Sequence, residues 1–555
     1  MPPRVFGGEG GGFMRYDYVI VGGGSAGCVL ANRLSADGKH SVCLLEAGPA
    51  DSNPFIAIPG GILQIIRSKL HNWHFFTEPQ RHLDNRPRYW PRGKTLGGSS
   101  AINAMCYIRG HARDYDHWAS LGNTGWSYRD LLPLFRKSEH HEIGANDFHG
   151  TGGPLNVAPL RDPSPLAHAF IEAAEQAGFR RTADFNGAQQ EGVGLYEVMQ
   201  KNGQRCSNAH AFLREAEGRE NLTIRTGVHA TRVLFDGKRA VGVRVFESGR
   251  YLDIAANREV LLAAGAIGSP QLLLLSGVGP RDEIQRHGIS LVHELPGVGR
   301  NLQDHPDFII TTENTSRLAI SFHPLAFWRT IVAVFQYLFK KRGTLTSNSA
   351  EAGAFTKSSP SEPIPDLQYH LVVAANTRHA QDLSTLFKFC YSLHVCILRP
   401  KSRGTVTLRS SDALAAPVIQ PNYCEHPEDF EKLVLGFKQA RHILSQPAWT
   451  AHRGAELEPG MAVQSDEHIR AWVRANTETV YHPVGTCKMG LDDMAVVDSQ
   501  LRVRGIEGLR VIDASIMPTL IGGNTNAPTT VIGEKGAAMI LEQALSRPAA
   551  TALAA

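Results

Sequence analysis

The chain of 555 residues is longer than one hydrophobic core usually supports, so we expect two domains or one elaborated domain. Its 57 basic and 53 acidic residues give a formal charge of +4, which argues against nucleic acid as a partner because no large basic field results. The eight cysteines lie singly, without a C-x-x-C pair, and indicate buried thiols of a reducing compartment, the cytoplasm.

The first thirteen residues, MPPRVFGGEGGGF, contain one Arg and no apolar segment, so they do not resemble a secretory signal. Met14 directly precedes the first predicted strand, and we interpret residues 1–13 as an extension. No run of eighteen or more apolar residues occurs, which argues against a membrane-spanning helix.

Residues 16–46 carry the strongest local signal. An apolar run predicts a buried strand that ends in a turn of the form G-x-G-x-x-G, made by Gly22, Gly24 and Gly27, and a helix follows. Glycines at this spacing allow the backbone to approach a pyrophosphate, and the helix N-terminus faces its charge. The next predicted strand ends at Glu46, whose carboxylate can accept hydrogen bonds from both ribose hydroxyls. The pattern predicts a dinucleotide site.

The same turn also fits a second motif. Residues 23–27 match G-x-S-x-G, the nucleophile elbow of an α/β-hydrolase, with Ser25 at its centre. A hydrolase would give no role to Glu46 or to the glycines on both sides of Ser25. The dinucleotide site is therefore favoured, and a hydrolase remains the competing class.

A possible metal pair lies in the loops that follow. His71 and His74 form H-x-x-H, but neither a third ligand nor the helical context of HExxH accompanies them. A loop with an aromatic anchor at Trp73 is favoured, and we predict no metal site.

Three later stretches carry a family resemblance. RGKTLGGSSAIN at 92–103, GAIGSPQLLLLSGVGP at 265–280 and YHPVGTCKMG at 481–490 resemble the glucose-methanol-choline (GMC) oxidoreductases, and the likeness runs from about residue 16 to residue 542. The resemblance implies FAD as cofactor and oxidation of an alcohol by hydride transfer to flavin N5.

The expected fold class is α/β, with a Rossmann-type FAD-binding domain that is discontinuous in sequence and a second α+β substrate domain built on an antiparallel sheet. We assign residues 14–160, 205–315 and 480–545 to the FAD-binding domain. Residues 161–204 and 316–479 form the expected substrate domain.

The resemblance also implies site residues. His482, in Tyr-His-Pro, matches the catalytic histidine, and the second active-site position, His or Asn across the family, falls on Asn526. The other residues that the resemblance places around FAD are Gly22, Gly24, Ser25, Ala26 and Gly27 at the pyrophosphate, Glu46 at the ribose, Val228 at the adenine, Gly98, Ser99, Asn103 and Met105 beside the isoalloxazine, Asp513, Ala514, Asn524 and Thr525 near the ribityl chain and ring, and Ala47, Trp73, Arg92 and Ala104 elsewhere.

Some family members attach the flavin through a histidine near the Gly-Gly-Ser-Ser stretch. Here Ile102 occupies that neighbourhood, and no histidine lies between Arg92 and Gly110. We therefore expect FAD to be bound without a covalent bond.

Several local elements follow from periodicity. Residues 221–245 alternate about Asp236-Gly237 and predict a hairpin. Residues 259–266 predict a strand whose end passes close to the cofactor at Gly265. Residues 392–407 predict a strand pair about a Pro-Lys-Ser-Arg-Gly turn, which would floor the substrate cavity, and residues 531–545 predict a helix.

Residues 324–341 are apolar nearly all round, with a basic end. A buried helix or a lid over the substrate entrance is the favoured interpretation. The alternative is a helix that rests on the inner face of a membrane, which would make the protein peripheral to it.

Within the family the chain is most similar to bacterial choline dehydrogenases and aliphatic alcohol dehydrogenases. We expect a primary alcohol as substrate and a quinone-type electron acceptor, because residues 325–339 suit a hydrophobic alcohol and no cage for a quaternary ammonium is recognisable. Choline dehydrogenase and an oxygen-using alcohol oxidase are the alternatives. A flavin photodecarboxylase on the same fold is a further class, since fold does not fix the reaction.

Overall fold

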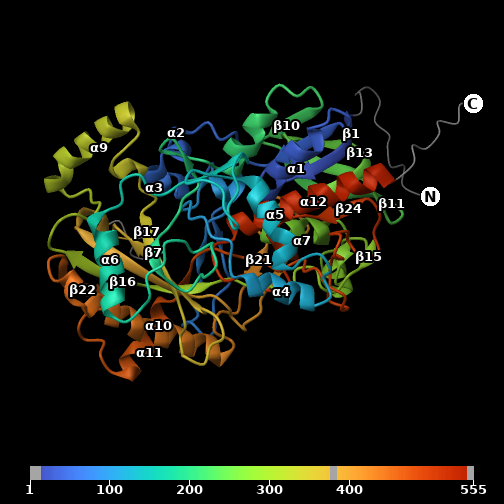
Figure 1. Ribbon diagram of the computed structural model, residues 1–555. Coiled ribbons are helices and arrows are strands. Elements are labelled where there is room, and N and C mark those ends of the chain that lie inside the picture. Colours follow the sequence, from blue (N-terminus) through green and yellow to red (C-terminus); the bar gives the residue numbers. More distant parts are fainter. Residues whose placement is uncertain (1–13, 376–383, 547–555) are drawn as a thin grey trace, which may run out of the picture.

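The computed structural model describes residues 14–375 and 384–546. The predicted extension at 1–13 and the end of the C-terminal tail lie outside these residues. Two seven-stranded sheets occupy opposite halves of the molecule (Figure 1).

The first sheet contains the glycine turn. Its strands run in the order β10-β2-β1-β13-β12-β11, and β24 pairs with β13. The bounds are β1 Met14–Val21, β2 Val42–Glu46, β10 Leu222–Thr226, β11 His229–Asp236, β12 Arg239–Glu247, β13 Arg250–Leu262 and β24 Leu509–Val511. All pairings among β10, β2, β1, β13 and β24 are parallel. Every residue of β2 is buried, as expected for a parallel strand covered on both faces.

Two helices from opposite ends of the chain pack against each other beside this sheet. They are α1, Ser25–Ser35, and α12, Asn526–Ser546 (Figure 1). The C-terminal segment therefore returns to the first sheet through β24 and α12, as the predicted discontinuous domain requires. The helix predicted at 531–545 exists but begins earlier, at Asn526.

The second sheet is antiparallel, with the order β22-β16-β19-β18-β17-β7, and β23 pairs with β16. Its strands are β7 Gly192–Leu195, β16 Pro306–Asn314, β17 Ala350–Thr356, β18 Leu367–Val372, β19 Cys390–Ile397, β22 Arg453–Glu458 and β23 Glu478–Thr479. The helices α6 Pro165–Gln176, α10 Pro427–Ser445 and α11 Asp466–Asn476 pack on it. The predicted fold class is confirmed.

Shorter elements connect the two sheets. The helices are α2 Pro54–Ala57, α3 Ile62–Ile66, α4 Ala112–Ser120, α5 Tyr128–Ser138, α7 Gly265–Leu275, α8 Arg281–Arg286 and α9 Phe327–Lys340. The two-stranded pairs are β3 Phe75–Phe76 with β4 Tyr89–Trp90, β5 Glu139–His141 with β6 Leu155–Val157, β8 Gln200–Lys201 with β9 Gln204–Arg205, β14 Val278–Gly279 with β15 His293–Glu294, and β20 Thr405–Thr407 with β21 Val418–Gln420.

Of the three predictions for local strands, one is confirmed and two are wrong. The hairpin about Asp236-Gly237 is confirmed as β11 and β12. The strand predicted through residue 266 is wrong at its end, because β13 stops at Leu262 and Gly265, with φ of +77°, opens α7. The strand pair at 392–407 is also wrong. Both edges of β19 are occupied by β16 and β18, so β20 pairs with β21 instead.

One predicted domain boundary needs correction. The division at residue 315 assigned β16 to the FAD-binding segment 205–315, yet β16 pairs with β19 and β22 in the second sheet. The boundary therefore lies on the N-terminal side of β16. The other boundaries stay a prediction.

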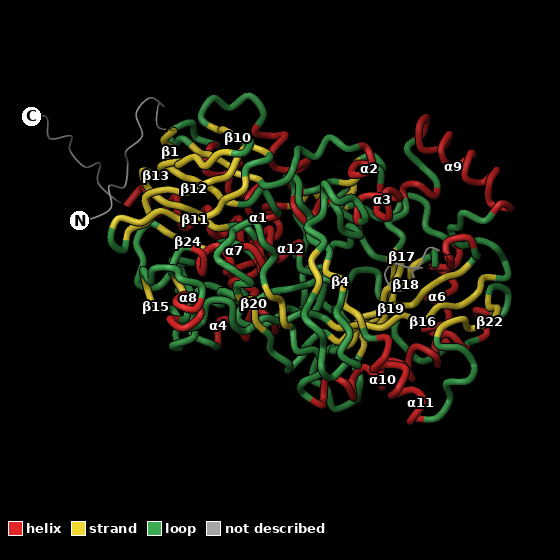
Figure 2. The backbone as a smooth tube through the Cα atoms, turned by 180° about the vertical axis from the view of Figure 1, so that it is seen from behind, coloured by secondary structure: helices red, strands yellow, loops and turns green. Residues whose placement is uncertain are grey.

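Helix α9 projects from the body of the molecule, as the views from the front (Figure 1) and from behind (Figure 2) both show. Only Ala333 and Tyr337 of this helix are buried, so the prediction of a buried helix is wrong. The other form of the favoured interpretation, a lid over the substrate entrance, stays a prediction. Over residues 14–375 and 384–546, no helix has the length and apolar character that crossing a membrane requires.

Candidate active site

A cavity of about 510 Å³ extends from the glycine turn to the second sheet. The predicted cofactor and catalytic residues that line it are Gly22, Gly24, Ser25, Ala26, Glu46, Ala47, Trp73, Arg92, Gly98, Ser99, Asn103, Ala104, Met105, Val228, His482, Asp513, Ala514, Asn524, Thr525 and Asn526. The structure thus brings together residues from both ends of the chain around one space.

The glycine turn packs directly against the backbone at Ala263, so the space on its other side stays open for a ligand. A Cβ at Gly22, whose φ is +105°, would lie 2.5 Å from the carbonyl oxygen of Ala263. A Cβ at Gly27 would lie 1.9 Å from the Gly22 oxygen, so Gly27, which does not line the cavity, permits close packing of α1 on β1. Gly24 is the N-cap of α1 and no side chain caps the helix. The first N–H groups of α1 can therefore donate hydrogen bonds to an anion.

Glu46 closes the same end of the cavity. Its Oε2 accepts from the Gly23 N–H at 2.9 Å, and its Oε1 accepts from the Gly48 N–H at 2.8 Å. Burial raises the pKa of Glu46 to about 7. Val228 donates its N–H to the Glu46 carbonyl at 2.9 Å, which holds the end of β2 beside the start of β11.

Arg92 links Ser99 to the segment that carries His482. Its Nη2 donates to Ser99 Oγ at 2.6 Å and its Nη1 donates to the Tyr481 carbonyl at 2.7 Å. Burial lowers the pKa of Arg92 to about 10, which leaves the guanidinium charged at neutral pH. Met105 nearby has a positive φ of 60°, held by a hydrogen bond from its N–H to Asn103 Oδ1 at 3.0 Å.

His482 lies at the far end, and its neighbours determine its tautomer. Its Nδ1 is 2.9 Å from His305 Nδ1, while His305 Nε2 is 3.1 Å from the Leu398 carbonyl oxygen. A carbonyl only accepts, so His305 carries its proton on Nε2 and accepts at Nδ1. The proton of neutral His482 is therefore on Nδ1, which leaves Nε2 as the basic atom. Burial lowers the pKa of His305 to about 3, and burial, with His305 close by, holds the pKa of His482 well below 6.5.

The backbone of His482 is also fixed. Asp304 Oδ1 accepts from the His482 N–H at 2.6 Å, and Asp304 Oδ2 accepts from the hydroxyls of Thr479 and Tyr423. Tyr481, directly before the histidine, has φ of +65°, a conformation that a bulky side chain rarely adopts. Asp304 and His305 together hold both the main chain and the ring of His482.

The second active-site residue requires a correction. Asn526 was predicted, but its Nδ2 donates to Asn208 Oδ1 at 3.1 Å at the start of α12. Asn524, two residues earlier, places its Nδ2 3.4 Å from His482 Nε2. Asn524 is therefore the amide beside the basic nitrogen, and it was predicted only as a cofactor residue.

Sequence reasoning missed the polar residues of the second sheet. His370 on β18 and His394 on β19 are cross-strand partners that line the cavity, and His394 Nδ1 lies 2.7 Å from Asp307 Oδ2. His305 was missed as well, although it stands in Asp-His-Pro, a tripeptide similar to the Tyr-His-Pro of His482. Strand alternation would place Gln368 and His370 on one face, but only the pairing shows which face meets the cavity.

The substrate end of the cavity is largely apolar. Ile66, Phe322, Val372, Leu386 and Val480 contribute to its wall. Among the described residues, the acidic side chains that line the cavity are those of Glu46 and Asp513, both from the predicted cofactor set. An uncharged, apolar ligand suits this end.

Two groups of histidines lie outside the cavity, and each has the residue types that metal ions prefer. His71 and His74 make separate hydrogen bonds, to Ser68 Oγ at 2.9 Å and to the Tyr89 hydroxyl at 3.2 Å. Their arrangement matches the favoured loop rather than a shared metal site.

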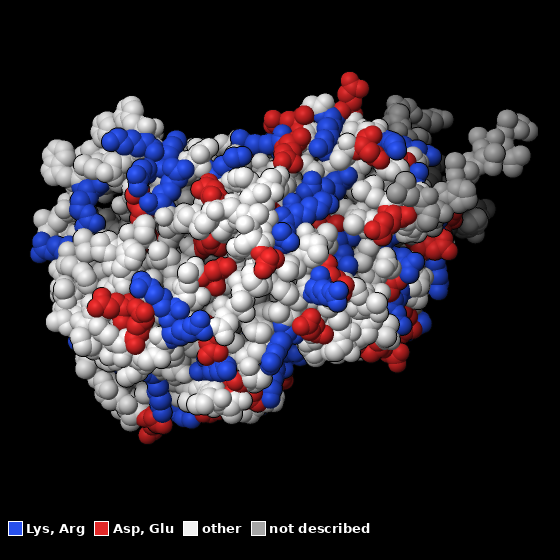
Figure 3. All heavy atoms as spheres, viewed as in Figure 1, with Lys and Arg blue, Asp and Glu red and all other residues white. Residues whose placement is uncertain are grey.

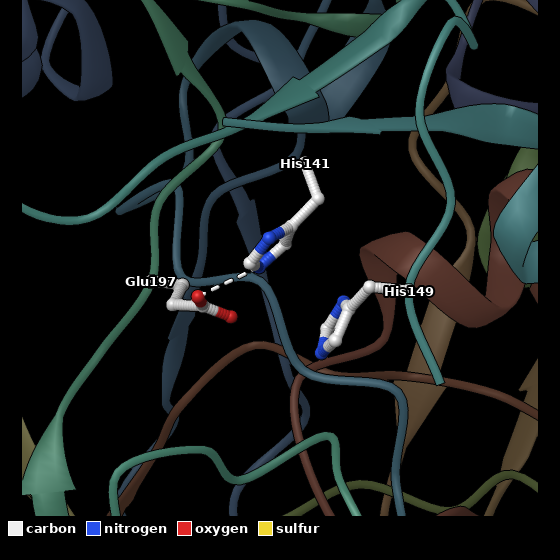
Figure 4. Close-up of side chains that lie close together, drawn as sticks. All are labelled: His141, His149 and Glu197. Carbon is white, nitrogen blue, oxygen red and sulfur yellow. Dashed lines mark hydrogen bonds and ion pairs between the residues drawn. The ribbon is translucent and has the colours of Figure 1, made fainter. Parts of the chain in front are cut away.

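The second group consists of His141, His149 and Glu197 (Figure 4). The two rings lie 4.0 Å apart, and His141 Nε2 is 2.7 Å from Glu197 Oε1. His149 directs Nδ1 to Glu139 Oε1 at 3.2 Å and Nε2 to Asp184 Oδ2 at 3.1 Å. Because carboxylates occupy both nitrogens, this arrangement favours an ion-pair network over a metal site. Burial opposes the charge, but the hydrogen bonds that His149 donates to Asp184 and Glu139 raise its pKa to about 9.

The chain matches known proteins over most of its length. Family models for GMC oxidoreductases match residues 16–307 and 400–533. The chain is 49% identical to an alcohol dehydrogenase [acceptor] of Pseudomonas putida, over 95% of this chain and 96% of that protein. It is 45% identical to an oxygen-dependent choline dehydrogenase of Rhizobium etli, over 96% and 97%.

Solved structures show the same fold. Pyridoxine 4-oxidase from Mesorbium loti superposes with a TM-score of 0.86 at 32% identity, covering 95% of this chain and 99% of that one. A formate oxidase superposes with a TM-score of 0.88 at 26% identity, covering 96% and 99%.

Proposed function

Because the chain belongs to the GMC oxidoreductase family, we propose that it binds FAD without a covalent bond and oxidises a primary alcohol to the aldehyde. The observation that carries the proposal is the cavity that joins the glycine turn to the Nε2 side of His482. The hydrolase alternative gains no support, since Ser25 Oγ has no hydrogen-bonded histidine or acid within the described parts of the chain.

The residues present fit FAD. The turn at Gly22 and Gly24 and the uncapped start of α1 would hold the pyrophosphate, and Glu46 would accept from the adenosine ribose. Ser99 and Met105 would flank the isoalloxazine ring of the flavin. The chemistry that FAD supplies when bound is acceptance of a hydride from the alcohol carbon.

The protein's own part is to move the proton and hold the substrate oxygen. An alcohol releases a hydride readily only as its hydroxyl loses its proton, and the basic Nε2 of His482 is placed to take it. The resulting imidazolium keeps its Nδ1–H bonded to His305 Nδ1. Asn524 Nδ2, beside His482 Nε2, would donate to the same substrate oxygen.

The apolar end of the cavity favours a hydrophobic alcohol over choline. A quaternary ammonium requires a carboxylate or an aromatic cage. Asp304 and Asp307, the acidic residues on either side of His305, are buried and do not line the cavity. Asp304 accepts from the His482 N–H, and Asp307 pairs with His394.

The proposed electron acceptor is a quinone. Support comes from the similarity to an alcohol dehydrogenase [acceptor], while the choline dehydrogenase relatives are named as oxygen-dependent. An oxygen-using oxidase is therefore the second candidate. Comparison of flavin reoxidation by a ubiquinone analogue and by oxygen in stopped flow separates the two.

Anaerobic mixing with a panel of primary alcohols tests the reaction. We expect a yellow protein whose flavin bleaches with aliphatic or aromatic alcohols and is released by acid precipitation. A colourless protein that cleaves esters would support the hydrolase, and light-dependent loss of CO₂ from a fatty acid would support the photodecarboxylase. Flavin that stays on the precipitated chain would contradict non-covalent binding.

We also propose that α9 docks on an anionic membrane surface. Trp328 and Phe339 are 73% and 78% exposed, far more than large apolar side chains usually are. Residues 316–350 contain five basic residues and no acidic one, and basic side chains lie beside the uncharged surface of α9 (Figure 3). Phe322, which precedes α9, lines the cavity and is 54% exposed, so the cavity opens near this helix. Apolar alcohols and quinones could enter from the lipid.

A further inference from the structure

The Asn524 side chain accepts a hydrogen bond from Gln368, which lies behind the cavity wall, and it also interacts with His370, which lines the cavity. Gln368 on β18 is fully buried, and its Nε2 lies 3.0 Å from Asn524 Oδ1 and 3.0 Å from the Tyr196 hydroxyl. The Tyr196 hydroxyl donates to the carbonyl of Tyr369 at 2.7 Å. Since a carbonyl only accepts, the Tyr196 proton is committed there, and its oxygen is left to accept.

This commitment settles the direction of each hydrogen bond that follows. The end of Gln368 that faces Tyr196 must be the amide NH₂, which therefore also donates to Asn524 Oδ1. Asn524 then turns its own NH₂ toward His482 Nε2, 3.4 Å away. From the other side, the Leu398 carbonyl and His305 leave a lone pair on that nitrogen. One hydrogen-bond chain runs from the Tyr369 carbonyl through Tyr196, Gln368 and Asn524, and the other runs from the Leu398 carbonyl through His305. Both chains require His482 Nε2 to be a hydrogen-bond acceptor.

We propose that Gln368, held by Tyr196, is a positioning residue that keeps the N–H donors of Asn524, and not its oxygen, directed at the substrate oxygen. The inference rests on the proposed function, because it places an alcohol hydroxyl between Asn524 and His482. Donors stabilise the negative charge that grows on this oxygen during deprotonation. If the Asn524 amide were reversed, its oxygen would repel that charge and would accept a hydrogen bond from a protonated His482 Nε2, which favours the charged form of the histidine.

A double-mutant cycle tests the proposal. Gln368→Met removes the donor at nearly constant volume and should lower the rate of anaerobic flavin reduction by about tenfold, less than the loss of a whole oxyanion donor. In the Asn524→Ala background the same change should alter the rate less than twofold. Tyr196→Phe, which removes only the group that distinguishes the two ends of the Gln368 amide, should slow reduction to an intermediate degree. Equal effects of Gln368→Met in both backgrounds would overturn the proposal.

The matched control is Gln439→Met on α10, since Gln439 also bonds a buried tyrosine, accepting from Tyr369 Oη at 2.9 Å and donating to the Lys357 carbonyl at 2.8 Å. It loses comparable hydrogen bonds but has no contact with Asn524. We expect its reduction rate to match that of the parent protein. A drop equal to that of Gln368→Met would mean that only general stability is being measured.

A pH profile provides a readout that a merely structural role would not move. The charged and titratable groups around the His482 ring are His305, His370, Arg92 and Asp307, and all remain in the Gln368→Met protein. Once Asn524 can turn its oxygen to Nε2, the apparent pKa of reduction should rise, and no rise should occur in the Asn524→Ala background. An unchanged profile would count against the proposal.

Thermal unfolding of the same four proteins of the cycle separates this inference from the proposed function. Gln368→Met should lower the Tm more in the parent than in the Asn524→Ala background. If this coupling is found but no alcohol reduces the flavin, the proposed function fails and the Gln368 assignment stands. If alcohols reduce the flavin but the Tm effects simply add, the Gln368 assignment fails.

Discussion

His305 and His482 face each other through their Nδ1 atoms, 2.9 Å apart, and the Leu398 carbonyl decides which of the two carries the shared proton. The path beyond His305 ends on that carbonyl, which cannot take up a proton at neutral pH. A proton that arrives on His482 Nε2 therefore has no exit through His305. On the proposed mechanism it must leave through the cavity.

Loss of the base gives the first prediction. His482→Ala should lower the rate of anaerobic flavin reduction by about 10²–10⁴-fold, because no other group takes the hydroxyl proton. FAD should remain bound, and flavin absorbance per chain checks this. The control is His452→Ala, which removes a histidine bonded to Ser316. Its flavin should be reduced at the rate of the parent protein. Near-normal reduction of the His482 variant would remove it as the base.

The partner histidine gives a second prediction. His305→Phe removes the acceptor for His482 Nδ1–H, so the unproductive tautomer becomes available. Reduction should slow by roughly 10²–10⁴-fold, the range between a slightly misplaced catalytic group and a wrong histidine tautomer. His305→Gln offers an amide oxygen at a similar distance and should recover most of the rate. Stopped-flow reduction of both variants is the measurement. Identical rates for the two would show that the acceptor is unimportant.

The ribose contact gives a third prediction. Glu46→Ala should raise the Kd of FAD by about 10–100-fold, the loss expected for hydrogen bonds to a charged group. Glu46→Gln keeps an oxygen that can accept from Gly23 or Gly48 and should lose less. Titration of the apoprotein with FAD, followed by fluorescence, measures both. Unaffected binding in Glu46→Ala would show that the ribose is held elsewhere.

The α9 surface gives a fourth prediction. Burial of each large apolar side chain contributes about 1.5–3 kcal/mol, so replacing Trp328, Phe335 and Phe339 by Ser should lower vesicle binding at least about tenfold. Flotation with phosphatidylcholine vesicles, with and without phosphatidylglycerol, is the measurement. Ser at the exposed Met461 and Leu491, outside this helix, is the control. Failure of the parent protein to float with either kind of vesicle would disprove membrane docking.

The His149 network gives a prediction on pH. The folded-state pKa of His149, about 9, is higher than the 6.5 of a free histidine, so its charge stabilises the fold fully below pH 6.5 and progressively less as the pH rises toward and past 9. The shift corresponds to about 3 kcal/mol. The Tm difference between the parent and His149→Gln should therefore be largest below pH 6.5 and shrink above it. A difference that grows with pH would contradict a charged His149.

The sequence predicted the nucleotide half of the site well, because each step there is local. The turn at Gly22, the strand ending at Glu46 and the returning C-terminal helix are encoded in short patterns of glycine and apolar residues. The error between Asn524 and Asn526 arose where no periodicity constrains the chain, since both side chains lie in a loop or at the first residue of a helix.

The other failures have long-range causes. Whether β20 pairs with β19 depends on β16, about ninety residues earlier, which already occupies that edge. The apolar pattern of α9 is the same for a core helix and for an exposed one, so only tertiary structure could decide between them. Gln368 acts through partners on other elements, which no local pattern reveals.

The contribution of β24 and α12 to the first sheet has a consequence for biosynthesis. A nascent chain on the ribosome displays the glycine turn early, but it lacks the parallel neighbour of β13 and the helix that covers α1 until residues 509–546 have been made. The first sheet is therefore incomplete until the segment that follows the second sheet has joined it. A prematurely terminated product would be left with an open, unloaded nucleotide fold.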